Sequence, residues 1–167
     1  DRRPLPLTTI RQEHYADPEA VEKAARMILQ AEKPVMVVGD RVGQTGAVEA
    51  AVRLAELTGM PVYQEHLSCG LNFPFDHPQF AGKLPPNGPH IAKAAAEADL
   101  VIWVGVTSQA PLLYYDAPLI PPGTPLIAVD LDARQLGKNV SAALAILGNP
   151  RAVLERWAEW IDTHAAQ

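Results

Sequence analysis

Short, continuous runs of apolar residues are the feature that most constrains how this 167-residue chain can fold. Three clear runs lie at residues 34–39, 100–105 and 125–130. A strand that is apolar along its whole length suits a parallel sheet, because such a sheet is covered on both faces. Weaker patterns at 61–65 and 142–147 bring the expected strands to about five, and a short sixth strand is expected near 80–84.

Helix signals separate these strands. Asp17 followed by Pro18 is a typical helix start and predicts a helix over 17–31. The other helices are expected at 47–59, at 89–98 and after Asn149. Strands that alternate with helices predict an α/β fold, a three-layer Rossmann-like domain whose mostly parallel sheet has about six strands.

The ends of the chain and its charge narrow the class of protein. Residues 1–16 are polar, bear prolines and predict a linker, and 17–167 form the domain. Because the chain starts with Asp1, we expect a domain cut from a longer polypeptide.

The formal net charge of −5 favours neither nucleic acid nor a membrane surface as a partner. No apolar run is long enough to predict a membrane span or a signal peptide. Cys69 is the single cysteine and cannot form an internal disulfide, so we expect a cytoplasmic location.

Glycines and aspartates follow two of the expected strands. The first strand leads into 39–46, where the spacing G-x-x-x-G-x-x-G is neither the dinucleotide fingerprint nor a phosphate loop with its lysine. This segment either cradles a phosphate or makes a tight turn that needs small residues, and the turn is favoured. Asp130 either binds a ribose or caps the following segment, whereas Asp132 is expected to cap a short helix.

Two segments, 66–87 and 106–124, are longer than ordinary connections. Long connections in compact domains are usually functional or contact another domain. In the second segment, Tyr114, Tyr115 and Asp116 form a polar-aromatic cluster that we expect to pack against a neighbouring domain.

The stretch FPFDHPQFAG, residues 73–82, has no secondary-structure period and places His77 between prolines. His77 is a candidate either for proton transfer or for packing. No cofactor-binding residue can be assigned from the sequence, and no metal site is predicted. The remaining histidines lack metal-ligand spacing and are expected to be surface or capping residues: His14, His66, His90 and His164.

Taken in order, several segments resemble the central domain of thiamine-diphosphate-dependent enzymes that act on 2-oxo acids. The segments are AEKPVMVVGDRVGQTGAVEAAVRLAELTGMPVY, FPFDHPQFAGKLPPNG, ADLVIWVGV, PPGTPLIAVDLD and ALAILGNPRAVLERW. The pattern FP-x-x-HP-x-F-x-G, and the Tyr-Asp followed by Pro-Gly-Thr, are closest to benzoylformate decarboxylases. Acetolactate synthases come next, through the shared Asp-His-Pro. The resemblance implies a parallel sheet of six strands.

The resemblance also implies that the domains of such an enzyme have different functions. Thiamine diphosphate and Mg2+ would be bound between N- and C-terminal domains of the same polypeptide, and the Gly-Asp-Gly motif of the C-terminal domain is absent here. The chain would then be the central scaffold of a decarboxylase, a homotetrameric lyase, and would be inactive alone. His77 matches a histidine that the resemblance links to proton transfer in the active site.

A flavin is not expected. Flavin-bearing acetolactate synthases resemble this chain but show His-Gly and Arg-Phe-Asp-Asp where it has Asn87-Gly88 and residues 107–110. FAD binding is therefore predicted to be unlikely. The alternatives are the central domain of an acetolactate synthase-like carboligase with an FAD site, a nucleotide-binding domain of the same fold, and a purely structural spacer.

Overall fold

The computed structural model describes residues 16–107 and 114–165. Its sheet has six strands in the order β3-β2-β1-β4-β5-β6, and all five neighbouring pairs are parallel. The strands are β1 (Pro34–Val38), β2 (Val62–Gln64), β3 (Phe80–Lys83), β4 (Leu100–Val104), β5 (Leu126–Asp130) and β6 (Leu144–Leu147). The predicted α/β Rossmann-like fold is confirmed, and the sheet is fully rather than mostly parallel.

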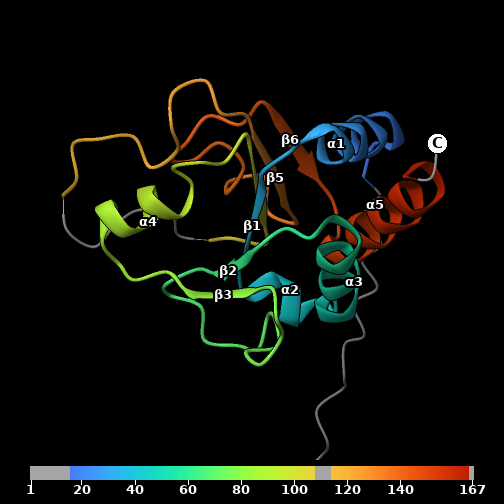
Figure 1. The fold of residues 1–167 in the computed structure, drawn as a ribbon, viewed down its shortest axis with the longest axis horizontal. Helices are drawn as coiled ribbons and strands as arrows, with labels where there is room; N and C mark the ends of the chain where they lie inside the picture. Colours follow the sequence, from blue (N-terminus) through green and yellow to red (C-terminus); the bar gives the residue numbers. More distant parts are fainter. Residues whose placement is uncertain (1–15, 108–113, 166–167) are drawn as a thin grey trace, which may run out of the picture.

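Helices lie on both faces of the sheet (Figure 1). The helices are α1 (Pro18–Gln30), α2 (Asp40–Gln44), α3 (Val48–Thr58), α4 (Gly88–Ala94) and α5 (Pro150–His164). Along β1 the side chains alternate: Met36 and Val38 join the core under α1, α3 and α5, whereas Val35 and Val37 lie on the α4 side. Since both sets are buried, β1 has no polar side, as its sequence predicts.

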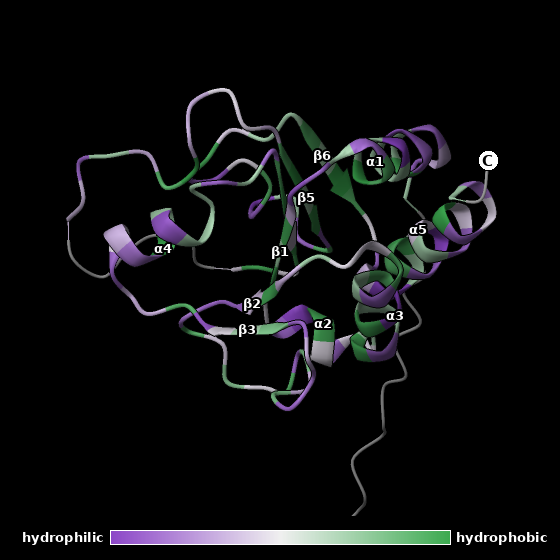
Figure 2. Ribbon diagram, viewed as in Figure 1, coloured by the Kyte–Doolittle hydropathy of each residue, from purple (hydrophilic) through white to green (hydrophobic). Residues whose placement is uncertain are grey.

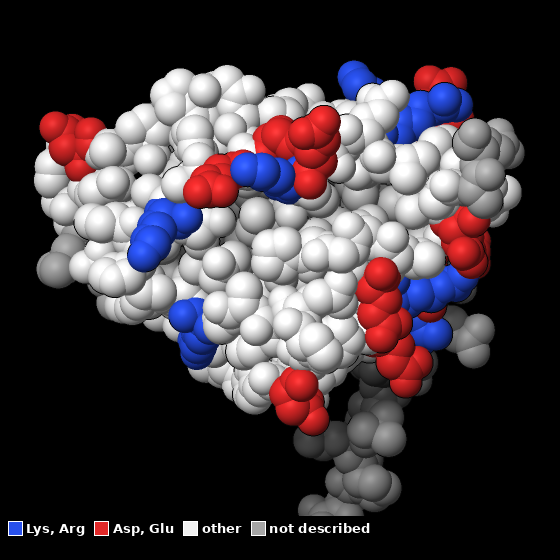
Figure 3. All heavy atoms as spheres, viewed as in Figure 1, with Lys and Arg blue, Asp and Glu red and all other residues white. Residues whose placement is uncertain are grey.

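Hydropathy follows this layering. β1, β5 and β6 are coloured mainly hydrophobic, whereas α1, α3 and α5 carry both hydrophilic and hydrophobic colours (Figure 2). No helix in the described part of the chain is both long and apolar enough to cross a membrane. On the face seen in Figure 3, basic and acidic side chains are interspersed and form no continuous basic surface.

The predicted helix signals act as expected. Asp17 accepts a hydrogen bond from the backbone nitrogen of Glu19, and Asn149 accepts one from that of Arg151. Gly59 ends α3 with a φ of 70°. A left-handed residue at this position favours glycine, so the predicted stop is confirmed.

The segments at 40–44 and 89–98 differ from expectation. The glycine-bearing stretch after β1 contains the short helix α2, which the sequence pattern did not predict. The helix expected at 89–98 is α4 and ends at Ala94, because the following amides bond three residues back rather than four. The first fifteen residues of the expected linker lie outside the described residues.

Trp157 lies in the hydrophobic core between the sheet and helices α1, α3 and α5. Its side chain is fully buried in α5, and its indole nitrogen donates a hydrogen bond to the carbonyl oxygen of Val21 in α1, at 3.0 Å. One side chain thereby both fills the core and fixes the distance between two helices that the sequence separates by most of its length.

We expect Trp157→Phe to lower the free energy of unfolding by about 1–3 kcal/mol, because it removes a buried hydrogen bond and leaves a small void. Urea denaturation measures this loss. The matched control is Trp160→Phe in the same helix. Trp160 is half-buried and stacks on His164, so its replacement should cost less than about 1 kcal/mol. Equal losses for the two variants would contradict the anchoring role of Trp157.

Candidate functional site

Parallel strands place all their carboxyl ends at one edge of the sheet, and this edge is the candidate site. In open α/β sheets, ligands bind at that edge where the strand order reverses direction. Here the reversal lies between β1 and β4, since β2 and β3 continue on one side and β5 and β6 on the other. Four polar residues lie at or just after the ends of these strands: Asp40, Glu65, Thr107 and Asp130.

The tips of β1 and β4 approach each other closely. The backbone nitrogen of Gly39 donates to the carbonyl oxygen of Val104 at 2.9 Å, so the pairing continues past the end of β1. A Cβ atom on Gly39 would lie only 2.3 Å from the carbonyl oxygen of Gly105. Gly39 is therefore required by a close backbone contact, which supports the tight-turn interpretation of the glycine segment.

Asp40 fastens the segment after β2 to α2. Its carboxylate accepts hydrogen bonds from the hydroxyl of Ser68, the backbone nitrogens of Cys69 and Gly70, and the amide of Asn72. Burial alone would raise the pKa of Asp40, but the hydrogen bonds from Ser68, Gly70, Asn72 and Cys69 outweigh burial and lower it to about 2. The carboxylate of Asp40 therefore stays charged and has a structural role: it holds residues 68–72 in place.

Glu65 makes a second bridge along this edge. It is fully buried after β2, and its two carboxylate oxygens accept from the backbone nitrogen and the hydroxyl of Thr107, at 2.9 and 3.1 Å. The bridge spans β1 and ties the end of β2 to the end of β4. A buried carboxylate that is fully engaged in this way stabilises the edge rather than presenting charge to a ligand.

Asp130 and Asp132 meet the guanidinium of Arg41. The Nε atom of Arg41 lies 3.0 Å from Asp130, and its Nη2 atom lies 3.7 Å from Asp132. Burial raises the pKa of Asp130 despite the hydrogen bond from Asp132 and the charge of Arg41. Asp132 also pairs with Arg134 and accepts from its backbone nitrogen, in a turn rather than at a helix start. The expected helix cap at Asp132 is therefore wrong, because residues 133–137 form turns and no helix follows Asp132.

His66 is buried, which corrects the expectation of a surface or capping residue. Its side chain is 7% exposed, and neither ring nitrogen has a hydrogen-bond partner among the described residues. Burial, together with the charge of Lys83, lowers its pKa and favours the neutral ring. No periodic pattern marks His66 as buried. The other two described histidines fit the expectation better: His90 is exposed and His164 is half-buried at the end of α5.

His77 lies before β3, at the amino edge of the sheet and not at the candidate edge. Its Nδ1 atom accepts from the backbone nitrogen of Gln79, and its Nε2 atom lies 3.4 Å from a carboxylate oxygen of Glu56 in α3. Its ring packs edge-on against Phe73, and its side chain is 15% exposed. The structure therefore brings His77 together with α3 and not with Asp40, Glu65 or Asp130.

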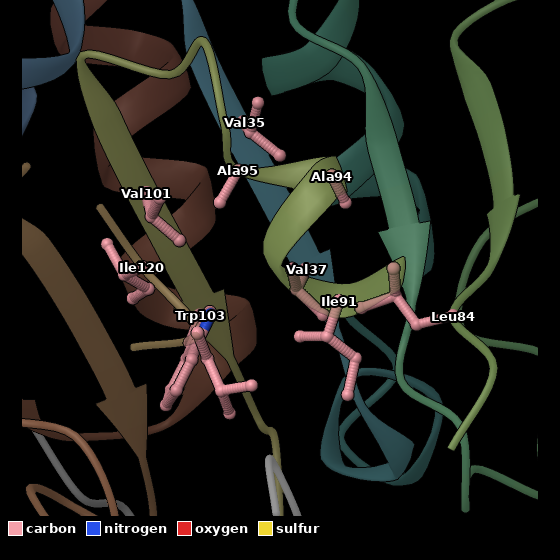
Figure 4. Close-up of a pocket in the computed structure, with 10 residues that line it drawn as sticks. Val35, Val37, Leu84, Ile91, Ala94, Ala95, Val101, Trp103 and Ile120 are labelled. Atoms are coloured by element: carbon pink, nitrogen blue, oxygen red, sulfur yellow. The ribbon is translucent and has the colours of Figure 1, made fainter. Parts of the chain in front are cut away.

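Among the described residues, the α4 side of the sheet holds no ligand-sized cavity at its centre. Apolar side chains from α4, β1 and β4 converge there, and they enclose only about 10 Å3 (Figure 4). Tyr115 packs against Gly88 at the start of α4, where a Cβ would lie 2.2 Å from the tyrosine ring. Tyr114 is exposed and donates to Asp116. Within the described ranges, no group of three histidine, cysteine, aspartate or glutamate side chains could hold a metal ion.

Comparison with known proteins identifies relatives of this domain. The model of the family "Thiamine pyrophosphate enzyme, central domain" matches residues 21–157. A probable acetolactate synthase large subunit of Methanocaldococcus jannaschii is 34% identical over 138 residues, which are 82% of this chain and 23% of that protein. Human 2-hydroxyacyl-CoA lyase 1 is 29% identical over 88% of this chain and 24% of its own length. The chain thus spans about a quarter of the length of these relatives.

Solved structures agree with this family. A putative thiamin diphosphate-dependent enzyme from Mycobacterium smegmatis superposes with a TM-score of 0.85 at 29% identity, over 97% of this chain and 31% of that one. Benzoylformate decarboxylase from Polynucleobacter necessarius gives 0.84 at 21% identity, over 92% and 29%. The second likeness concerns the fold alone.

Asp40→Asn tests the anchoring carboxylate. At pH 7 we expect a loss of about 1–3 kcal/mol in unfolding free energy, because charged hydrogen bonds to residues 68–72 are weakened. The pKa of Asp40 in the folded chain, about 2, lies below the ordinary aspartate value of 3.8, so the unfolded chain takes up the proton first as the pH falls. The advantage of the wild type is thus complete above about pH 5 and shrinks between about pH 5 and about pH 2.

Urea denaturation at a series of pH values measures this difference. Asp162→Asn is the control, because Asp162 pairs with Arg53 on the surface and should contribute only about 0–1 kcal/mol. A gap between wild type and Asp40→Asn that stays constant down to pH 2 would rule out this role of the carboxylate.

Proposed function

The chain belongs to the family of thiamine pyrophosphate enzyme central domains, and we propose that it is the scaffold domain of a thiamine-diphosphate- and Mg2+-dependent 2-oxo acid decarboxylase. The observation that carries this proposal lies at the candidate edge. Asp40, Glu65 and Asp130 are each engaged by groups of the domain itself. Acids that hold the fold together are typical of a scaffold rather than of a catalytic centre.

A second candidate is a carboligase of the acetolactate synthase type. It is favoured by the sequence relatives, since acetolactate synthases from Methanocaldococcus jannaschii and mycobacteria are among the most similar proteins. The decarboxylase rests on the loop pattern around His77 and on a shared fold. Both candidates use this domain as a scaffold, and the carboligase alternative adds an FAD site to it.

The cofactors do not fit the described residues. When bound, thiamine diphosphate supplies a carbanion-stabilising centre. Within the described ranges, the chain offers no metal-ligand cluster for the Mg2+ that accompanies it. We propose that N- and C-terminal domains of the same polypeptide bind both, in a cytoplasmic homotetramer. Exposed apolar side chains on the connection after β2, Leu71 at 58% and Phe75 at 61%, offer contact surface for such a domain.

The complete polypeptide carrying this domain should release CO2 from 2-oxo acids when thiamine diphosphate and Mg2+ are supplied, and the 167-residue chain alone should not. Coupled CO2 assays with benzoylformate and pyruvate measure both. Formation of acetolactate from pyruvate would favour the carboligase over the decarboxylase. Turnover by the isolated chain above the protein-free rate would contradict the scaffold role.

Two roles for His77 remain open, and its contacts support packing more strongly than proton transfer. Both ring nitrogens face groups of the domain, Gln79 and Glu56, and the ring lies against Phe73. Proton transfer would require another domain to bring a substrate to this edge. The family resemblance of the loop is what supports that alternative.

His77→Phe in the complete enzyme separates the two roles. We expect unfolding free energy to fall by about 1–3 kcal/mol while kcat of the folded enzyme changes less than about threefold, because the variant loses hydrogen bonds but keeps most of the ring volume. Denaturation and steady-state rates measure these effects. If His77 transfers protons, kcat should instead fall by about 10²–10⁴-fold at unchanged stability, and the pH profile of kcat should lose one limb.

A further inference from the structure

Arg41 reaches across the candidate edge from one strand end to another. It lies in the first turn of α2, directly after β1, and its guanidinium pairs with Asp130 at the end of β5. Strand β4 lies between β1 and β5 in the sheet. The side chain must therefore pass over the tip of β4 to make this contact.

Gly105 leaves room for that passage. It follows β4 with a φ of 64°, and a Cβ added to it would lie 2.7 Å from the Cβ of Arg41. Any other residue at this position would collide with the start of the arginine side chain. The glycine and the arginine thus form one arrangement, in which a side chain from α2 fills the space above β4.

The contact is well shielded from water. Asp130 is 2% exposed, and the side chain of Arg41 is 20% exposed. One oxygen of Asp130 receives Arg41, and the other has no hydrogen-bond partner among the described residues. An ion pair in such surroundings is costly to break, because separation leaves a buried charge without compensation.

We propose that Arg41 is the specificity-determining residue of the candidate edge: by pairing with Asp130, it prevents nucleotides from binding there. In dinucleotide-binding folds an acid at a strand end holds the ribose hydroxyls. Asp130 is such an acid, one strand away from the reversal point. Here the guanidinium of Arg41 is already paired with Asp130, and a nucleotide would have to displace that guanidinium. This inference goes beyond the scaffold function, and it opposes the carboligase alternative that carries an FAD site in this domain.

Arg41→Ala tests the proposal, with ADP and FAD as probes in isothermal titration calorimetry. Wild type should show no saturable binding up to about 1 mM, and the variant should bind ADP, FAD or both at least about tenfold more tightly than that limit. Arg134→Ala is the matched control. It removes an exposed guanidinium from Asp132 but leaves Arg41 in place, so it should behave like the wild type.

Saturable binding by the wild type, or no gain in a folded Arg41→Ala protein, would overturn the proposal. If Arg41→Ala does not fold, Arg41→Gln keeps part of the side chain without its charge and should show the same gain. The wild type offers a readout without any substitution: the NMR signal of the Arg41 Nε–H group should not shift when about 1 mM ADP is added. A shift would contradict closure, whatever the activity of the complete enzyme.

Discussion

Parallel pairing of all six strands is the constraint on which the rest of this structure depends. It buries β1 and β4 on both faces, and it brings the residues after every strand to a single edge. Three carboxylates therefore lie along this one edge, those of Asp40, Glu65 and Asp130. An edge of this kind needs either ligands or internal partners, because buried charges are costly when they are unpaired.

The domain supplies internal partners for all three. Asp40 binds the segment that follows β2, Glu65 binds Thr107 after β4, and Asp130 binds Arg41. Each bridge joins the end of one strand to a segment that follows another strand. The same acids that make the edge look like a ligand site therefore stiffen it, which suits a domain that holds others in position. Membership of the thiamine pyrophosphate enzyme central domain family agrees with such a role.

Local patterns predicted the fold well, because its causes are local. The valine-rich run of β1, the cap at Asp17 and the glycine stop at Gly59 each act within a few residues. Predictions about side chains at the edge were poorer. The burial of His66 and the reach of Arg41 depend on which strands become neighbours, and no periodicity encodes that. Asp130 and the glycine segment were recognised as candidates, but their partners lie far away in the sequence.

Cofactor binding by the isolated domain is the most direct test of the scaffold account. Isothermal titration of the 167-residue chain with thiamine diphosphate in the presence of Mg2+ should give no saturable heat at ligand concentrations up to about 1 mM. Saturable binding of one thiamine diphosphate per chain, dependent on Mg2+, would place the catalytic centre within this domain and contradict the account.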